Sequence, residues 1–155
     1  MAADPNNFTY AVPMDRSNLA DVVDIENLVS PAPWNLNVFS DCLTAGYECW
    51  ILPGKPCRGF IVFAVSSNEA HLLNIAVHPN YQQRGLGRYL LRLGIELAQD
   101  KNAQKMFLEV RPSNSLARQL YSSEGFKFLS CRKNYYGSPK KEDALVLMND
   151  LSQIK

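Results

Sequence analysis

A glycine-containing turn is the most informative segment of the chain for chemistry. Gln82, Gly85 and Gly87 follow the apolar run Asn74–Val77, and a helical pattern of leucines comes next. Glycine lets a backbone approach a ligand closely, and the first turn of a helix offers amide groups without intrahelical partners. The positive end of the helix dipole adds to this, so the segment suits a phosphate. Leu90 occupies the third glycine position of a dinucleotide motif, and Gly-Lys-Ser/Thr is absent, which argues against both of those phosphate motifs.

A second set of reactive side chains follows that helix. Glu109 lies in the alternating segment Lys105–Arg111, and Asn114 and Tyr121 come after it. A carboxylate can accept a proton from an amine, and a phenol can donate one. Taken alone, the strand pattern favours a surface ion pair of Glu109 with Arg111, and a helical tyrosine commonly packs on its own helix. Asn114 alone would suit a helix N-cap.

These two sets belong to a longer series of motifs that resembles the GCN5-related N-acetyltransferase (GNAT) superfamily. In chain order the motifs are Ala32-Pro33-Trp34, Gln82-x-x-Gly85-x-Gly87, Leu108 to Asn114, Ala117-x-x-Leu120-Tyr121-x-x-x-Gly125-Phe126, Arg132 to Tyr136, and Glu142-Asp143-Ala144-Leu145-x-x-Met148. The first and the last two look like one branch, the RimI-type N-α-acetyltransferases. The resemblance spans Pro33–Met148 and is closest from Leu73 onward.

The resemblance implies both a fold and a reaction. The fold is an α/β GNAT fold, with a single mixed, mostly antiparallel central sheet of about six to seven strands flanked by about four helices. The reaction is transfer of an acetyl group from acetyl-coenzyme A to the N-terminal alanine of a small-subunit ribosomal protein. The implied partner is the N-terminal peptide of that protein, and no metal is required.

The resemblance assigns the donor site to the glycine turn and the strand before it. Backbone groups of the strand would pair with the pantetheine arm like an added strand, and turn amides would bind the pyrophosphate. Asn114 would hydrogen-bond the pantetheine region. The implied cofactor-binding residues are Ile75, Ala76, Val77, Gln83, Arg84, Gly85, Leu86, Gly87, Arg88 and Asn114. For Arg84 and Arg88, a solvated helix face is an equally good interpretation.

The resemblance also implies catalytic and acceptor residues. Glu109 would accept the proton of the amine, directly or through an ordered water, and Tyr121 would protonate the leaving thiolate. A free α-amine has a pKa of about 7.7–8.0 and needs only a mild base, whereas a lysine amine near 10.4 would demand more. Trp34, Tyr135 and Tyr136 are predicted to line the acceptor groove, although Trp34 fits a core anchor equally well.

The histidines and cysteines favour structural roles. His71 and His78 have no suitable partner in the sequence, and no Cys-x-x-Cys spacing occurs, so a metal site is not expected. The four cysteines, Cys42, Cys49, Cys57 and Cys131, are predicted to be reduced thiols, mostly packed as small hydrophobes.

Hydrophobic periodicity predicts alternating strands and helices in one α/β domain. Strands are expected at Phe8–Val12, Glu48–Leu52, Arg58–Ser66, Glu69–Val77, Lys105–Arg111, Phe126–Arg132 and Ala144–Met148. Helices are expected from Asp15 or Ser17 to Val29, over Asn37–Thr44 and Gly85–Gln99, and after Asn114 to Glu124. The continuous apolar run Phe60–Val65 indicates a central strand covered on both faces.

Composition bounds the function class. The chain has 155 residues, 46% of them hydrophobic, and 16 Lys and Arg against 15 Asp and Glu, a net charge of +1. Such a chain is expected to fold as one domain over residues 1–155, with residues 1–7 as a mobile tail. The near-zero charge argues against direct nucleic-acid binding. No signal or membrane-spanning segment is recognised, so a cytoplasmic monomer without membrane contact is expected.

Two alternative functions stay open at this point. The enzyme could acetylate other protein N-termini, lysine or a small amine. A non-catalytic acetyl-coenzyme A sensor is the alternative from another class, although the presence of both Glu109 and Tyr121 argues against it.

Overall fold

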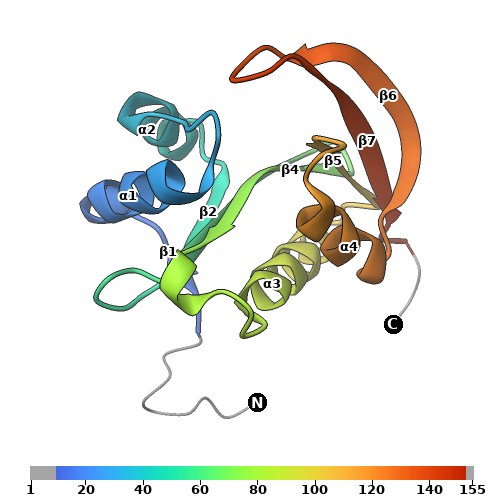
Figure 1. The fold of residues 1–155 in the computed structure, drawn as a ribbon. Helices are drawn as coiled ribbons and strands as arrows, with labels where there is room; N and C mark the ends of the chain where they lie inside the picture. The colour runs from blue at the N-terminus through green and yellow to red at the C-terminus, as the bar shows by residue number, and fades with distance from the viewer. Residues whose placement is uncertain (1–9, 153–155) are drawn as a thin grey trace. The chain divides into compact units, whose positions relative to one another are not determined.

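The computed structural model describes residues 10–152 of the chain. In that range it contains seven strands, four α-helices and two short 3₁₀ helices (Figure 1). In chain order they are β1 (Val12–Pro13), η1 (Arg16–Asn18), α1 (Leu19–Val29), α2 (Leu36–Thr44), β2 (Glu48–Leu52), β3 (Gly59–Ser66), β4 (Glu69–Val77), η2 (Pro79–Tyr81), α3 (Leu86–Asp100), β5 (Lys105–Val110), α4 (Ser115–Ser123), β6 (Lys127–Tyr136) and β7 (Glu142–Asp150). None of the helices in this range is long and apolar enough to cross a membrane.

The strands form one sheet in the order β1-β2-β3-β4-β5-β7-β6. β4 and β5 run parallel, whereas β1–β2, β2–β3, β5–β7 and β6–β7 are antiparallel pairs. The predicted mixed, mostly antiparallel sheet with flanking helices is therefore confirmed.

The contacts within the chain group it into two compact units. The first comprises the residues up to Ala64 together with Leu73–Leu91, and the second comprises Val65–Leu72 together with Arg92 onward. β3, β4 and α3 contribute residues to both units. A single domain over residues 1–155 stays a prediction, and the predicted mobile tail lies outside the described residues.

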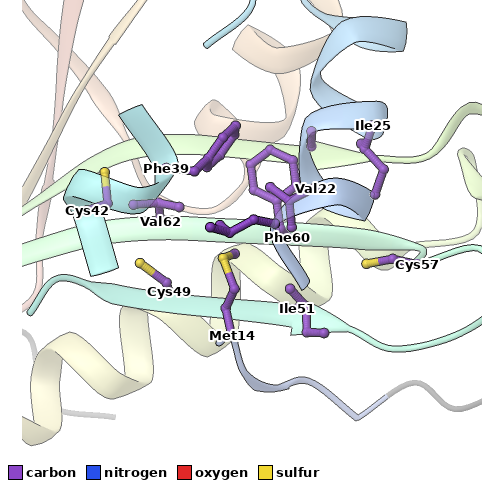
Figure 2. Packing of buried hydrophobic residues seen from close by; sticks show 12 residues of the cluster. Met14, Val22, Ile25, Phe39, Cys42, Cys49, Ile51, Cys57, Phe60 and Val62 are labelled. Carbon is purple, nitrogen blue, oxygen red and sulfur yellow. The ribbon is translucent and has the colours of Figure 1, made fainter. Parts of the chain in front are cut away.

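The first unit is built on β3. Its residues Phe60–Phe63 are fully buried, as the continuous apolar run predicted. Figure 2 shows side chains of α1 and α2 pointing at one face of this strand, with Val22 and Phe39 against Phe60. The rings of Phe39 and Phe60 meet edge to face, with centroids 5.3 Å apart. This apolar layer anchors both helices to the sheet.

The opposite face of β3 approaches its neighbours closely. A Cβ added to Gly59 would lie 2.8 Å from the Ala76 carbonyl oxygen and 3.3 Å from Cδ1 of Leu90 on α3. Any side chain at position 59 would therefore force the backbones of β3 and β4 apart. Gly59 allows the strand, β4 and the start of α3 to pack in contact.

The second unit is built on β5, which pairs with both β4 and β7. Met106, Leu108 and Val110 are buried, whereas Phe107 and Glu109 on the other face are half-buried. β6 is the edge strand and is exposed along most of its length, and it forms a long, curved pair with β7 (Figure 1). The alternation predicted for the strand of Glu109 is thus observed.

Most predicted element boundaries agree with the structure to within one or two residues, and the larger differences lie near the two ends of the chain. β2 and β4 match their predictions residue for residue. The first strand is Val12–Pro13 instead of Phe8–Val12, and residues 8 and 9 lie outside the described range. β6 was predicted to end at Arg132, but pairing with β7 continues to Tyr136 opposite Glu142. Tyr135 and Tyr136 therefore belong to a strand and not to the connection.

Candidate active site

The glycine turn connects η2 to α3 in the first unit. Gln83 and Gly85 have φ values of +63° and +81°, in the left-handed region that favours glycine. The Tyr89 amide donates to the Gly85 carbonyl oxygen at 3.0 Å, which joins the turn to the first turn of α3. A Cβ added to Gly85 would meet no atom within 4 Å. The turn is therefore open and precedes a helix N-terminus, a position that suits an anion.

Side chains around the turn add positive charge. The guanidinium carbons of Arg58 and Arg84 lie 5.2 and 5.4 Å from the centroid of the Tyr81 ring, within the range of cation–π attraction. Gln82 Nε2 donates to the Val77 carbonyl oxygen at 3.0 Å, which ties the turn to the end of β4. The sequence analysis missed Arg58 because no motif surrounds it.

The other residues of this unit that are predicted to bind acetyl-coenzyme A differ in exposure. Arg84 is exposed and Arg88 is half-buried, so a fully solvated helix face describes Arg84 better than Arg88. Ala76 and Leu86 are buried, and the remaining residues are half-buried or exposed: Ile75, Val77, Gln83, Gly85 and Gly87.

A buried carboxylate that the sequence analysis missed joins three segments of the first unit. Glu26 on α1 is 3% exposed. Its Oε2 accepts hydrogen bonds from the Trp34 amide and from Asn74 Nδ2 on β4, each at 3.1 Å. Burial raises the pKa of Glu26, although these two hydrogen bonds partly offset the effect. The carboxylate thus fixes the segment of Trp34 against β4.

Trp34 packs on the core of the first unit. Its ring meets that of Phe39 at an angle of 61°, with centroids 5.1 Å apart, and the residue is half-buried. The core-anchor interpretation therefore holds for the packed part of the ring. The remaining surface leaves room for the predicted acceptor contact.

Glu109 is held by a histidine in the second unit. The Glu109 side chain is 13% exposed, and its Oε1 lies 2.7 Å from Nε2 of His71, whose side chain is 41% exposed. The expected ion pair with Arg111 is therefore wrong, and so is the expectation that His71 lacks a partner. Parallel pairing of β4 with β5, with His71 opposite Phe107, brings the two side chains together. His78, by contrast, is structural as expected, because it caps η2 by accepting from the Asn80 amide.

Tyr136 lies in electrostatic reach of both Tyr121 and Glu109. Burial raises the pKa of Tyr121 to about 12, and the neighbouring Tyr136 adds to this rise. Burial also raises the pKa of Tyr136 to about 12, with Tyr135 and Glu109 contributing. Tyr121 is buried and packs edge-on against Phe126 at 5.8 Å, so its ring is also a core element. The structure thus brings Tyr121, Tyr136 and Glu109 into one cluster.

Arg111 fixes the segment between β6 and β7. Its guanidinium donates to Glu142 Oε1 at 3.2 Å and to the backbone carbonyls of Lys140 and Ser138, and it lies 4.2 Å from the Tyr136 ring centroid. Desolvation alone would raise the pKa of Glu142, but hydrogen bonds from Ser113 and Arg111 outweigh it and lower the pKa. The arginine that sequence reasoning paired with Glu109 therefore organises the 137–141 loop.

Asn114 is the N-cap of α4. Its Oδ1 accepts from the Ala117 amide at 3.3 Å, which confirms the N-cap interpretation. The side-chain Nδ2 of an asparagine in this role can still donate to a ligand.

Comparison with known proteins gives the same assignment as the motifs. The model of the acetyltransferase (GNAT) family matches residues 22–126. The chain is similar to the ribosomal protein bS18-alanine N-acetyltransferase of Salmonella typhimurium, at 42% identity over 141 residues that cover 90% of this chain and 95% of that protein.

Solved structures give the same result. The crystal structure of the ribosomal-protein-S18-alanine N-acetyltransferase from Escherichia coli has a TM-score of 0.85 at 32% identity, covering 94% of this chain and 96% of that one. The structure of yncA from Salmonella typhimurium with its cofactor acetyl-CoA shares the fold, with a TM-score of 0.76 at 20% identity, over 94% of this chain and 95% of that one. The predicted resemblance is confirmed.

Replacement of Glu26 should separate its charge from its hydrogen bonds. Its pKa is raised in the folded state, so its contribution to stability is complete below the unfolded pKa and is lost as the pH rises through the folded pKa. Glu26→Gln keeps an acceptor oxygen without the charge. The free energy of unfolding of this variant should therefore increase relative to that of wild type as the pH rises. Glu26→Ala leaves two donors without their acceptor and should lower the free energy of unfolding by about 1–3 kcal/mol.

Urea unfolding at pH 5 and pH 7.5 checks this. If the difference in free energy of unfolding between Glu26→Gln and wild type does not change with pH, the raised pKa of Glu26 is contradicted.

Proposed function

We propose a substrate and a mechanism for this chain, which belongs to the acetyltransferase (GNAT) family. The chain transfers the acetyl group of acetyl-coenzyme A to the α-amine of an N-terminal alanine on a small-subunit ribosomal protein. The observation that carries the proposal is its 42% identity, over 95% of that protein's length, to an enzyme named for this reaction on bS18. The presence of both Glu109 and Tyr121 supports a catalytic role of this chain over that of a non-catalytic sensor.

The first unit contains the elements that suit the donor. The open turn before α3 holds the pyrophosphate at the helix N-terminus, and Arg84 and Arg88 add charge. Backbone groups of Ile75, Ala76 and Val77 bind the pantetheine arm. Asn114 belongs to the second unit and is proposed separately as a donor to the cofactor through Nδ2. Acetyl-coenzyme A, when bound, supplies a thioester carbonyl that is activated toward amines. The presence of acetyl-CoA in the yncA structure supports this choice of donor.

Glu109 is the proposed proton acceptor. Its carboxylate is mostly shielded from water, with one oxygen held by His71, so its direction is fixed. An α-amine with a pKa of about 7.7–8.0 is partly neutral near pH 7.5 and needs only a mild base, such as a carboxylate, to take the one proton that it loses as the amide forms. A lysine amine near 10.4 would be almost entirely charged at that pH. The site therefore favours an N-terminus as acceptor.

Tyr121 is the proposed donor to the leaving sulfur. With a pKa of about 12 its phenol stays protonated throughout the neutral range, so the O–H is always available. A thiol near 8.5 is a stronger acid than this phenol, so complete proton transfer runs against the pKa order. We assign the stabilisation to the hydrogen bond that Tyr121 donates as negative charge develops on sulfur.

The acceptor peptide is proposed to contact aromatic side chains. Tyr136 lies beside Glu109 and is held by Arg111, and Tyr135 is perpendicular to it with a centroid distance of 4.9 Å. Trp34 offers the unpacked part of its ring. Aromatic rings of this kind suit contact with a first residue that has a small side chain, such as alanine.

The acceptor assignment can be tested with synthetic peptides. Peptides that carry the bS18 N-terminal sequence with alanine first should gain one acetyl group in intact-mass measurements with acetyl-coenzyme A. A bulky first residue should reduce kcat/KM about a hundredfold, because an acceptor site selective for alanine excludes the added volume. Acetylation of an N-blocked peptide that contains lysine would show that the acceptor is not an N-terminus.

Glu109→Gln tests the base. The amide retains the shape of the side chain but cannot take up the proton, so kcat should fall by about 10²–10³ while both KM values stay near wild type. Steady-state kinetics at saturating acetyl-coenzyme A measure this. Unchanged turnover would remove Glu109 from the mechanism.

Tyr121→Phe tests the donor to sulfur. The ring remains to pack on Phe126, so the fold and the dissociation constant for acetyl-coenzyme A should be retained. Loss of one hydrogen bond to developing charge should lower kcat about tenfold or more. Calorimetric titration of the cofactor and single-turnover rates separate binding from chemistry, and a wild-type rate would exclude this role.

A further inference from the structure

We propose that His71 is a positioning residue for Glu109. It holds one oxygen of the carboxylate, so that the other oxygen faces the acceptor amine and takes its proton. The inference rests on the proposed function, in which Glu109 is the base. His71 lies outside every motif that carries the family resemblance.

The sheet register makes the contact possible. His71 on β4 is opposite Phe107 on β5, and Glu109 is two residues further along the same face of β5. Diagonal neighbours on one face of a sheet lie within reach of long side chains. The Nε2 to Oε1 distance of 2.7 Å is that of a charge-assisted hydrogen bond. Because Nε2 donates to Oε1, Oε2 is the oxygen that can take the proton of the amine.

The other polar groups around the pair are engaged elsewhere or stay neutral. Arg111 donates to Glu142 and to two backbone carbonyls. Tyr136 and Tyr121 have pKa values raised to about 12, so neither phenol carries charge near neutral pH. His71 is therefore the side chain that holds the Glu109 carboxylate directly.

Two substitutions separate positioning from a purely structural role. His71→Ala removes the donor, whereas His71→Gln keeps an N–H donor. With both substrates saturating, His71→Ala should lower kcat about tenfold, with KM within about twofold of wild type, and His71→Gln should recover kcat to within about threefold.

Arg92→Ala is the matched control. It removes a cation–carboxylate contact of 2.8 Å, that of Arg92 with Glu124, in the same compact unit and outside the proposed site. Its kcat should equal that of wild type. Thermal unfolding of each variant confirms that it is folded, and if His71→Ala is not, His71→Leu, which fills the same space without an N–H donor, takes its place.

The outcomes distinguish this inference from the proposed function. Wild-type kcat in His71→Ala, or a kcat in His71→Gln as low as that in His71→Ala, would overturn the role of His71 even if Glu109→Gln is inactive. Wild-type kcat in Glu109→Gln would instead overturn the proposed base itself. A tenfold loss in His71→Ala with rescue by glutamine would support both.

Discussion

The parallel pairing of β4 with β5 is the constraint on which the chemistry of the second unit depends. It places His71 opposite Phe107 and so brings an imidazole within 2.7 Å of Glu109. Side chains alternate between the faces of a strand, so a shift of one residue would turn Glu109 to the buried face and Leu108 to the site. The apolar residues Met106, Leu108 and Val110 oppose that shift, because they bury fully only in the observed register. The burial of these three apolar residues therefore also determines which side chains lie on the other face of β5.

Two carboxylates, one buried and one half-buried, differ in the groups that hold them. Glu26 accepts from a backbone amide and an asparagine amide, neither of which changes charge near neutral pH. Its partners therefore hold three segments together and offer no route for a proton. Glu109 is held by an imidazole, and its charge contributes to the raised pKa of Tyr136. Glu26 thus connects segments of the first unit, whereas Glu109 is the proposed proton acceptor in the second.

Much of the fold followed from local pattern, whereas the pairing of site residues did not. The strands Glu48–Leu52 and Glu69–Val77 were predicted residue for residue because turn residues bound both of them. Asn114 was recognised as a cap because capping is local. The partner of Glu109 was not predicted, since His71 and Glu109 come together only through strand pairing.

Arg111 and Glu26 illustrate the same limit. Proximity along one strand suggested a pair of Arg111 with Glu109, but Glu142 on β7 supplies the better-placed carboxylate. Glu26 was not singled out in the sequence, and only the return of the chain at Trp34 and Asn74 gives it donors. The extent of β6 was underestimated because its exposed residues carry no apolar alternation.

Arg111 holds the loop 137–141 through backbone atoms, so the loop tolerates changes of side chain. The arginine donates to the carbonyl oxygens of Ser138 and Lys140, which every residue type possesses. Side chains at those positions can therefore be exchanged without loss of these hydrogen bonds. A library randomised at positions 138 and 140 would vary the surface of the loop while the backbone contacts of Arg111 are kept.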